Sequence, residues 1–250
     1  MQAQQAWSPE TPPDPAYYKY HGHWSKQARS ELAERDHLCF TATITRTQIK
    51  HFHAAGIDTL QQLSETALEH VPGVSPVLLD RLKVQARLQR SSIGKARPDY
   101  QLVDHDKEPA TGLQLLPPHS AQDVFFDMEG FPLIEDGLEY LWGCTYFTDN
   151  GERTFLDFWA HDAVAEKRAF ENIIDWVYAR WKADSSMHIY HYASYEVSAC
   201  RRLMGRFGTR EYELDQLLRN EVFVDLYRVV RQGLIVGEPR YSIKNIELLY

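Results

Sequence analysis

The spacing of apolar residues changes along the chain, and the change predicts two structurally different regions. In residues 41–90, apolar side chains recur every three or four positions, which is the period of an amphipathic helix. Helices are predicted at 45–55, at 67–71 and from Pro76 onward. Ser75 before Pro76 favours a helix start, because serine caps free N–H groups and proline suits the first turn. Residues 41–90 are therefore expected to form a small helical module.

From residue 120 onward, short strand-like runs alternate with helix-like ones. Strands are predicted at 124–127, 138–147, 153–159, 187–192 and 222–226. Helices are predicted at 163–182, 195–207 and 215–220, with the start of another in 241–250. Asn150-Gly151 lies between the second and third strands and favours a tight hairpin turn. This order predicts an α/β fold in which three antiparallel strands are followed by α/β units.

Two polar, proline-containing stretches complete the predicted organisation. Residues 1–40 begin with four prolines and carry few apolar side chains, so they are expected to be the tail of an upstream segment. Residues 91–119 are interrupted by glycine and proline, which is typical of a linker. The expected division of the chain is 1–40, 41–90, 91–119 and 120–250.

The first candidate site is a pair of acids at the end of the first strand, in the run from Val124 to Phe131. Strand side chains alternate between faces, so Asp127 and Glu129 are expected to project from the same face. Carboxylates held this close repel each other unless a cation lies between them. Oxygen-only ligands favour Mg²⁺ or Mn²⁺. The pair therefore predicts a divalent metal site, with a solvated pair of acids as the alternative.

The composition of the chain bears on where the protein acts and on what it binds. Three cysteines, Cys39, Cys144 and Cys200, lie far apart, which disfavours a disulfide framework and makes a reducing cytoplasm the default expectation. No run of 18 apolar residues is present, so no membrane association is expected. The net charge of −8 counts mildly against a nucleic-acid binder, although an enzyme that holds metal ions also carries clustered acids.

A second acidic motif follows the strand predicted at 187–192, in the run His191-Tyr192-Ala-Ser-Tyr195-Glu196. A strand that ends in this way and opens a helix resembles the second motif of the DnaQ-like 3′–5′ exonucleases. Two later segments, Phe223-Val-Asp-Leu-Tyr and Tyr241-Ser-Ile-Lys, resemble further segments of that superfamily. The order of all these motifs is most similar to the bacterial YprB-type domain that occurs with RecB-family nucleases and helicases.

The resemblance implies a ribonuclease H-like mixed sheet and a metal-dependent nuclease, expected to be a 3′–5′ exonuclease in DNA repair or processing. By the same resemblance, Asp127, Glu129 and Glu196 would hold two Mg²⁺ or Mn²⁺ ions and form the catalytic centre. Asp225 is a candidate further metal ligand, with a structural role in its strand as the alternative. The expected substrate contacts in this domain are His191, Tyr192 and Lys244.

The turn before Pro76 carries a further candidate contact. Two helices joined by a glycine turn resemble a helix-hairpin-helix, a motif that binds nucleic-acid phosphate through backbone N–H groups. Gly73 and Ser75 would form this contact, although the usual hairpin has glycine where Ser75 stands. A helical packing module without phosphate binding is the alternative.

The resemblance also implies that the last acidic motif of the superfamily is missing from this sequence. The last acidic motif of the superfamily would follow Tyr250, so the nuclease domain in 120–250 is expected to be C-terminally incomplete. A non-catalytic nucleic-acid-binding or scaffolding module is therefore a competing hypothesis, and an RNA exonuclease is another. The expected partners are DNA or RNA, and a helicase that is fused to the chain or acts with it.

Overall fold

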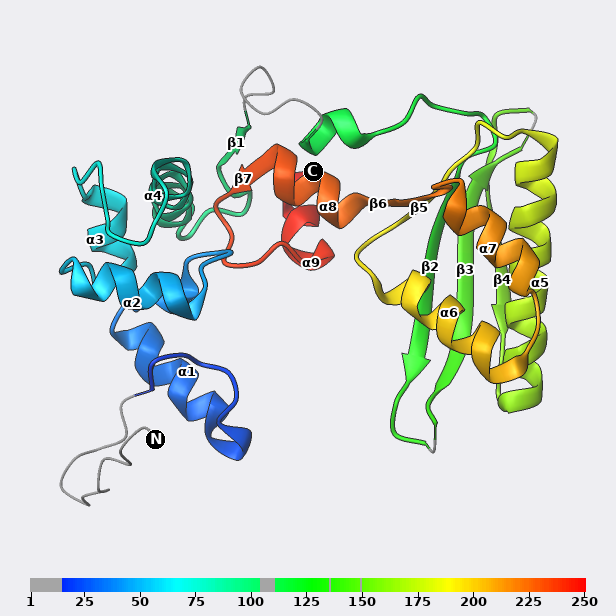
Figure 1. The fold of residues 1–250 in the computed structure, drawn as a ribbon, viewed down its shortest axis with the longest axis horizontal. Coiled ribbons are helices and arrows are strands. Elements are labelled where there is room, and N and C mark those ends of the chain that lie inside the picture. The colour runs from blue at the N-terminus through cyan, green and yellow to red at the C-terminus, as the bar shows by residue number, and fades with distance from the viewer. Residues whose placement is uncertain (1–14, 104–110, 135, 149) are drawn as a thin grey trace. The chain divides into compact units, whose positions relative to one another are not determined.

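The computed structural model describes residues 15–103, 111–134, 136–148 and 150–250 (Figure 1). The chain forms two compact units. The helical unit consists of residues 1–101 and 235–250, and the sheet unit consists of residues 102–234. Residues 235–250 thus group with the helical unit, whereas the sequence placed them with the nuclease domain. The four-part division made from the sequence stays a prediction.

The helical unit is built around a core of aliphatic and aromatic side chains. Its helices are α1 Ser25–Glu34, α2 Arg46–Ala54, α3 Leu60–Glu65, α4 Pro76–Ser91 and α9 Ile243–Ile246, with 3₁₀ turns at Gly22–Trp24, Leu38–Phe40 and Glu247–Leu249. Leu38, Phe52, Leu63 and Leu82 are completely buried in this core. Thr45 and Thr59 each cap a helix with a reciprocal hydrogen-bond box, which explains why α2 and α3 begin where they do.

The helix predicted at 67–71 is wrong. The chain is irregular after α3, and Val71 then pairs with Val74 across a tight turn. Gly73 in this turn has φ +82°, a conformation that favours glycine, and such a turn cannot continue a helix. Ser75 caps α4 as predicted, because its Oγ accepts a hydrogen bond from Leu78 N–H at 3.4 Å.

The sheet unit contains a mixed five-stranded sheet in the order β4-β3-β2-β5-β6. The strands are β2 Val124–Phe131, β3 Leu138–Phe147, β4 Arg153–Trp159, β5 Ile189–His191 and β6 Phe223–Asp225. Strands β2, β3 and β4 are antiparallel, whereas β5 and β6 run parallel to β2. The predicted α/β fold with three antiparallel strands followed by α/β units is confirmed.

Three helices cover one face of this sheet (Figure 1). They are α5 Ala163–Ala183, α6 Tyr195–Phe207 and α7 Glu211–Arg219. Phe126, Met128 and Trp142 point from the sheet into the same buried cluster as Phe170 and Leu203 of these helices. The opposite side of β2, β3 and β4, called the open face here, carries solvent-exposed side chains.

The remaining elements follow the sheet. Helix α8 Leu226–Gly233, which the sequence did not predict, packs on the 3₁₀ turn Gly112–Leu115. Strands β1 Tyr100–Leu102 and β7 Leu234–Val236 form a separate two-stranded sheet. Among the described residues, no helix has the length and apolar character needed to cross a membrane.

Candidate active site

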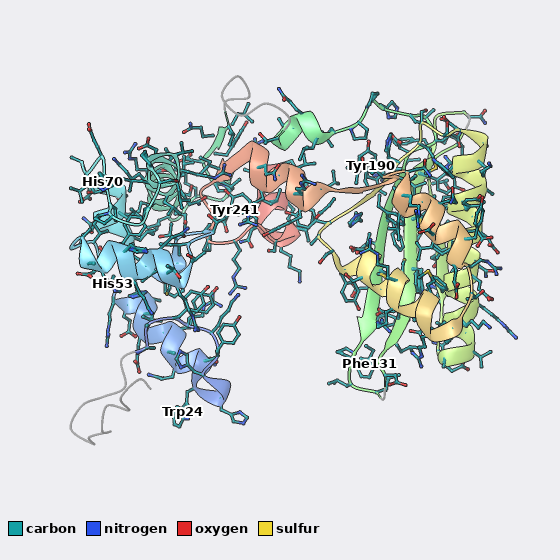
Figure 2. The ribbon with its side chains drawn as sticks, viewed as in Figure 1. Trp24, His53, His70, Phe131, Tyr190 and Tyr241 are labelled. Atoms are coloured by element: carbon teal, nitrogen blue, oxygen red, sulfur yellow. The ribbon has the colours of Figure 1, made fainter. Side chains whose placement is uncertain are left out.

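Strand β2 presents Asp127 and Glu129 on the open face. Burial alternates strictly along this strand, with Phe126 and Met128 in the core and both acids exposed. Figure 2 labels Phe131, the last residue of β2, and Tyr190, which pairs with Phe125 near the start of the strand. The two acids therefore lie between these labelled positions, on one face, as the alternation predicted.

Glu196 reaches the same region from the first turn of α6. The residue is only 4% exposed, and its Oε2 has no hydrogen-bond partner among the described residues. The closest positively chargeable group is the Nδ1 of His191, 3.5 Å from that oxygen. A buried carboxylate oxygen without a hydrogen bond is unfavourable, and a cation or a proton would relieve it.

The carboxyl of Asp127 feels the charges of the two other acids. Asp127 is accessible to solvent, but partial burial still raises the pKa of its carboxyl, and the hydrogen bond from the Met128 N–H opposes this effect. The charges of Glu196 and Glu129 raise this pKa further. The negative charges of Glu196 and Glu129 thus both act on the carboxyl of Asp127.

The donor set fits a divalent cation, although it is not preassembled. Carboxylate oxygens are the ligands preferred by Mg²⁺ and Mn²⁺, and the unpaired Glu196 oxygen is an available donor. In the described part of the chain, however, no group of three or more His, Cys, Asp and Glu side chains is spaced to hold a metal ion. The roles of Asp127, Glu129 and Glu196 as metal ligands and catalytic residues stay predictions.

His191 and Asp225 hold the backbone that leads into α6. They face each other as a register pair of β5 and β6. Asp225 Oδ1 accepts hydrogen bonds from the N–H groups of Ala193 and Tyr227, each at 2.9 Å. His191 Nδ1 lies 2.6 Å from the Ala193 carbonyl oxygen, so it can donate to that oxygen when protonated there. Ala193 itself has φ +72°, and these contacts stabilise this strained position next to the helix that carries Glu196.

These contacts favour the structural alternative for Asp225, whereas its role as a metal ligand stays a prediction. His191 is 5% exposed, so its side chain is buried beside the candidate site. The ring of Tyr192 packs edge-on against Tyr227, with centroids 5.7 Å apart. The expected substrate contacts of His191 and Tyr192 are not tested by these positions.

The other predicted substrate contacts lie in the helical unit. Lys244 is an exposed residue of the short helix α9. Gly73 and Ser75 form the turn before α4, and the imidazole of His51 occupies the space where a Gly73 side chain would be. The packing of His51 is sufficient to explain why glycine stands at position 73, and no bound phosphate is needed for that explanation. Phosphate binding at this turn and the contact of Lys244 therefore stay predictions.

Sequence reasoning missed a polar network that fixes the position of α6. Gly130 follows a β-bulge, because it pairs with Glu139 and leaves Tyr140 without a partner in β2. Glu139 is 3% exposed and accepts hydrogen bonds from the Tyr195 hydroxyl at 2.8 Å and from Arg202. Tyr195 immediately precedes Glu196, so this network anchors the start of the helix that carries the third acid.

Tyr195 serves this network as a hydrogen-bond donor. Burial raises its pKa to about 12, and the hydrogen bond to Glu139 acts in the same direction. A hydroxyl with so high a pKa is a poor general base near neutral pH. Tyr195 is therefore a positioning residue of the candidate site.

Gly130→Ala is expected to lower the free energy of unfolding by about 1–3 kcal/mol, the usual penalty of overpacking. An added Cβ would overlap both the Tyr195 hydroxyl and the Glu139 carboxylate. Urea unfolding followed by circular dichroism measures the change. Gly205→Ala is the matched control, because nothing lies within 4 Å of its added Cβ and alanine favours helix α6. Equal stability of the two variants would contradict the packing at Gly130.

Comparison with known proteins identifies one relationship. The sequence model of the RNase H superfamily matches residues 124–249, which begin at the first residue of β2 and include all three acids. The searches of curated proteins and of solved structures gave no match. The matched region comprises most of the sheet unit and nearly all of the C-terminal residues that group with the helical unit.

Proposed function

Because the chain belongs to the RNase H superfamily, we propose that it is a metal-dependent nuclease that hydrolyses nucleic-acid phosphodiester bonds. Proteins of this superfamily are generally nucleases, and they typically use divalent metal ions. In this proposal the catalytic residues are Asp127, Glu129 and Glu196. The cofactors are two Mg²⁺ or Mn²⁺ ions.

One observation carries the proposal. The buried Glu196 has an oxygen without a hydrogen bond, and its charge is one of the causes that raise the pKa of Asp127. A fold has no structural reason to bring these carboxyl groups together, because their repulsion destabilises it. Clustered acids of this kind are instead common where proteins bind metals or carry out catalysis.

The residues divide into ligands and supports. Asp127 and Glu129 would contribute oxygens from the open face, and Glu196 would contribute its unpaired oxygen from the helix. Divalent ions bound there would supply charge neutralisation at the phosphate and activation of water. His191 and Asp225 hold the backbone before α6, and Tyr195 holds its first turn through Glu139. These supports keep the carboxylates at fixed positions, which lowers the reorganisation needed during reaction.

Finer assignments extend the same proposal. The resemblance to DnaQ-like and YprB-type domains supports 3′–5′ exonuclease action in DNA repair or processing, in company with a RecB-family nuclease and a helicase. Tyr192 and Lys244 would contact the substrate, and Gly73 with Ser75 would bind phosphate in the helical unit. Metal ions act on the phosphate and not on the sugar, so an RNA exonuclease is an equal alternative on chemical grounds.

A second candidate function is a nucleic-acid-binding or scaffolding module without catalysis. It is favoured by the lack, among the residues described, of three or more side chains already spaced for a metal ion. The two functions differ in whether Mn²⁺ or Mg²⁺ produces cleavage and not only binding.

The test is a cleavage assay on the chain of 250 residues. End-labelled single-stranded DNA, duplex DNA and single-stranded RNA are incubated with Mg²⁺, Mn²⁺ or EDTA, and the products are separated on denaturing gels. A nuclease is expected to degrade at least one substrate with metal and none with EDTA. A ladder that shortens from the 3′ end would support the exonuclease. Binding without cleavage under all metal conditions would overturn the enzyme proposal in favour of the non-catalytic module.

A further inference from the structure

The open face of the sheet exposes aromatic side chains on the edge strand β4. Phe155 is 61% exposed and Trp159 is 54% exposed. They alternate with Phe158, which points toward the buried cluster, so the exposure follows from the face on which they lie. Large aromatic side chains left in solvent together are uncommon unless they contact a partner.

This aromatic surface is continuous with the candidate active site. Strand register places Glu129, Leu141 and Trp159 in one row across β2, β3 and β4, and Asp127 lies in the adjacent row. Neighbouring strands are about 4.8 Å apart, so Glu129 and Trp159 lie on the order of 10 Å from each other. The same face therefore carries the acids proposed as metal ligands and the exposed rings, at a separation of about two strands.

A glycine of β3 lies between the acids of β2 and the aromatic side chains of β4. Gly143 lies in the row between Asp127 of β2 and Asp157 of β4. A Cβ at Gly143 would approach the Phe155 ring to 2.9 Å, so that ring covers the bare backbone beside Asp127. Phe155 itself belongs to the neighbouring row, with Thr145 of β3 and Phe125 of β2, and its ring extends over Gly143 beside Asp127.

Two further residues orient and complement the surface. The Trp159 Nε1 donates a hydrogen bond to Asp157 Oδ2 at 2.7 Å, which fixes the indole ring on this face. Arg153 lies two residues before Phe155 and therefore on the same face of β4. No carboxylate among the residues described forms an ion pair with Arg153, so its charge is available for a phosphate.

We propose that Arg153, Phe155 and Trp159 bind single-stranded nucleic acid and lead its backbone to the acids of β2. The proposal rests on the nuclease function, and it adds the surface that receives the strand and the form of the substrate. Bases in a duplex already stack on each other, whereas unpaired bases can stack on aromatic side chains of a protein. Stacking does not depend on the sugar, so both DNA and RNA strands are accepted by this surface.

The spacing of the rings indicates how many bases they hold. Phe155 and Trp159 are four residues apart in a strand, which is about 13 Å. One base cannot contact both rings at that distance. The two rings therefore stack on different nucleotides. Arg153 is the first residue of β4, and it would lie near the phosphate of a third nucleotide.

The experiment measures binding separately from cleavage. Fluorescence anisotropy with labelled dT₁₂, rU₁₂ and a blunt DNA duplex is recorded in Ca²⁺, which occupies oxygen sites with looser geometry than Mg²⁺. Phe155→Ala and Trp159→Ala are each expected to weaken binding of both single strands by about 5- to 150-fold, the range for loss of one stacked base. Arg153→Gln is expected to reduce the slope of log affinity against log salt by about 0.7.

Controls separate stacking from folding. Tyr212 is 64% exposed on α7, which packs on the other side of the sheet, so Tyr212→Ala is expected to bind normally. Phe155→Tyr keeps an aromatic ring and is expected to retain affinity, whereas Phe155→Leu keeps apolar bulk and is expected to lose it. These two variants show whether binding needs an aromatic ring at position 155, even if an alanine variant folds poorly.

The possible failures are distinguishable. Normal single-strand affinity of the Phe155→Leu and Trp159→Ala variants would overturn the proposed surface, while metal-dependent cleavage by the unchanged chain would still support the nuclease. Tighter binding of the duplex than of dT₁₂ would also overturn it. Conversion of a dimer to a monomer by Phe155→Ala, with oligonucleotide affinity unchanged, would assign the face to a second copy of the chain.

Discussion

Asp127→Asn is expected to lower metal-dependent cleavage by about 10²–10³-fold, the usual effect of losing one group that stabilises developing charge. The same substitution is expected to raise the melting temperature in the absence of metal. Burial and the charges of Glu196 and Glu129 raise the pKa of Asp127, so its ionised form destabilises the folded state. Asparagine keeps the shape of the side chain and removes the charge.

The pH dependence of this difference follows from the direction of the pKa shift. The folded protein binds a proton at Asp127 more tightly than the unfolded chain does. The resulting stabilisation is complete below the unfolded pKa of about 3.9 and is lost as pH rises through the higher folded value. The advantage of Asp127→Asn should therefore be largest near neutral pH and disappear on acidification.

Thermal unfolding between pH 4 and pH 8, with and without Mn²⁺, measures both effects alongside the cleavage assay. Mn²⁺ should raise the melting temperature of the unchanged protein more than that of Asp127→Asn, because binding to the folded state stabilises it. Asp215→Asn removes an exposed acid of α7 that pairs with Arg219 and serves as the control. Full activity in Asp127→Asn would exclude Asp127 from the catalytic centre, and a lower melting temperature would contradict the repulsion.

Arg206→Ala is expected to destabilise the protein by about 3–5 kcal/mol, the usual result of removing one partner from a buried ion pair. Glu166 is completely buried, and its Oε2 accepts a hydrogen bond from Arg206 at 3.1 Å. Its other oxygen accepts from the backbone N–H of Glu139 at 2.7 Å. Without Arg206, the carboxylate would remain in the interior with no cation beside it.

Urea unfolding compares this variant with Arg219→Ala. Arg219 forms an exposed ion pair with Asp215 on α7, and such a pair contributes little to stability because solvent screens it. Adding Glu166→Gln to Arg206→Ala is expected to recover much of the loss, because it removes the uncompensated charge. A double variant as unstable as the single one would show that Arg206 acts through packing instead of charge.

The sequence predicted the elements that follow from regular spacing. Helix α6 begins and ends where predicted, and β3 and β4 have the predicted bounds. In α6 and β4 the side chains keep the period of their element, whereas β3 contains the bulge at Tyr140 and was recognised by its run of apolar and aromatic residues. Helix α8 was missed because its first residues follow directly on β6 and no glycine or proline marks the boundary. The helix predicted at 67–71 was wrong because the chain is irregular there and Val71 pairs with Val74 across the turn before α4.

The supports of the candidate site were harder to predict than the acids. Glu139 lies in a strand where alternation would place it toward solvent, but the bulge at Tyr140 turns it toward the helices. A bulge has no reliable pattern in a single sequence. The backbone hydrogen bonds of Asp225 were invisible for a similar reason, since its partner Ala193 lies 32 residues away.

The two crossings of the chain between its units have a consequence for synthesis on the ribosome. The sheet unit is a continuous segment, and its ends meet where Val103 N–H bonds to the Gly233 carbonyl at 2.9 Å. The helical unit is interrupted, and its buried Gln85 bonds to the Val236 carbonyl and to the Tyr241 hydroxyl. A chain emerges from the ribosome in the order of its sequence, so residues 1–101 must wait for residues 235–250 before their unit is complete. The later segment, which carries the acids, can complete its fold before the earlier one does.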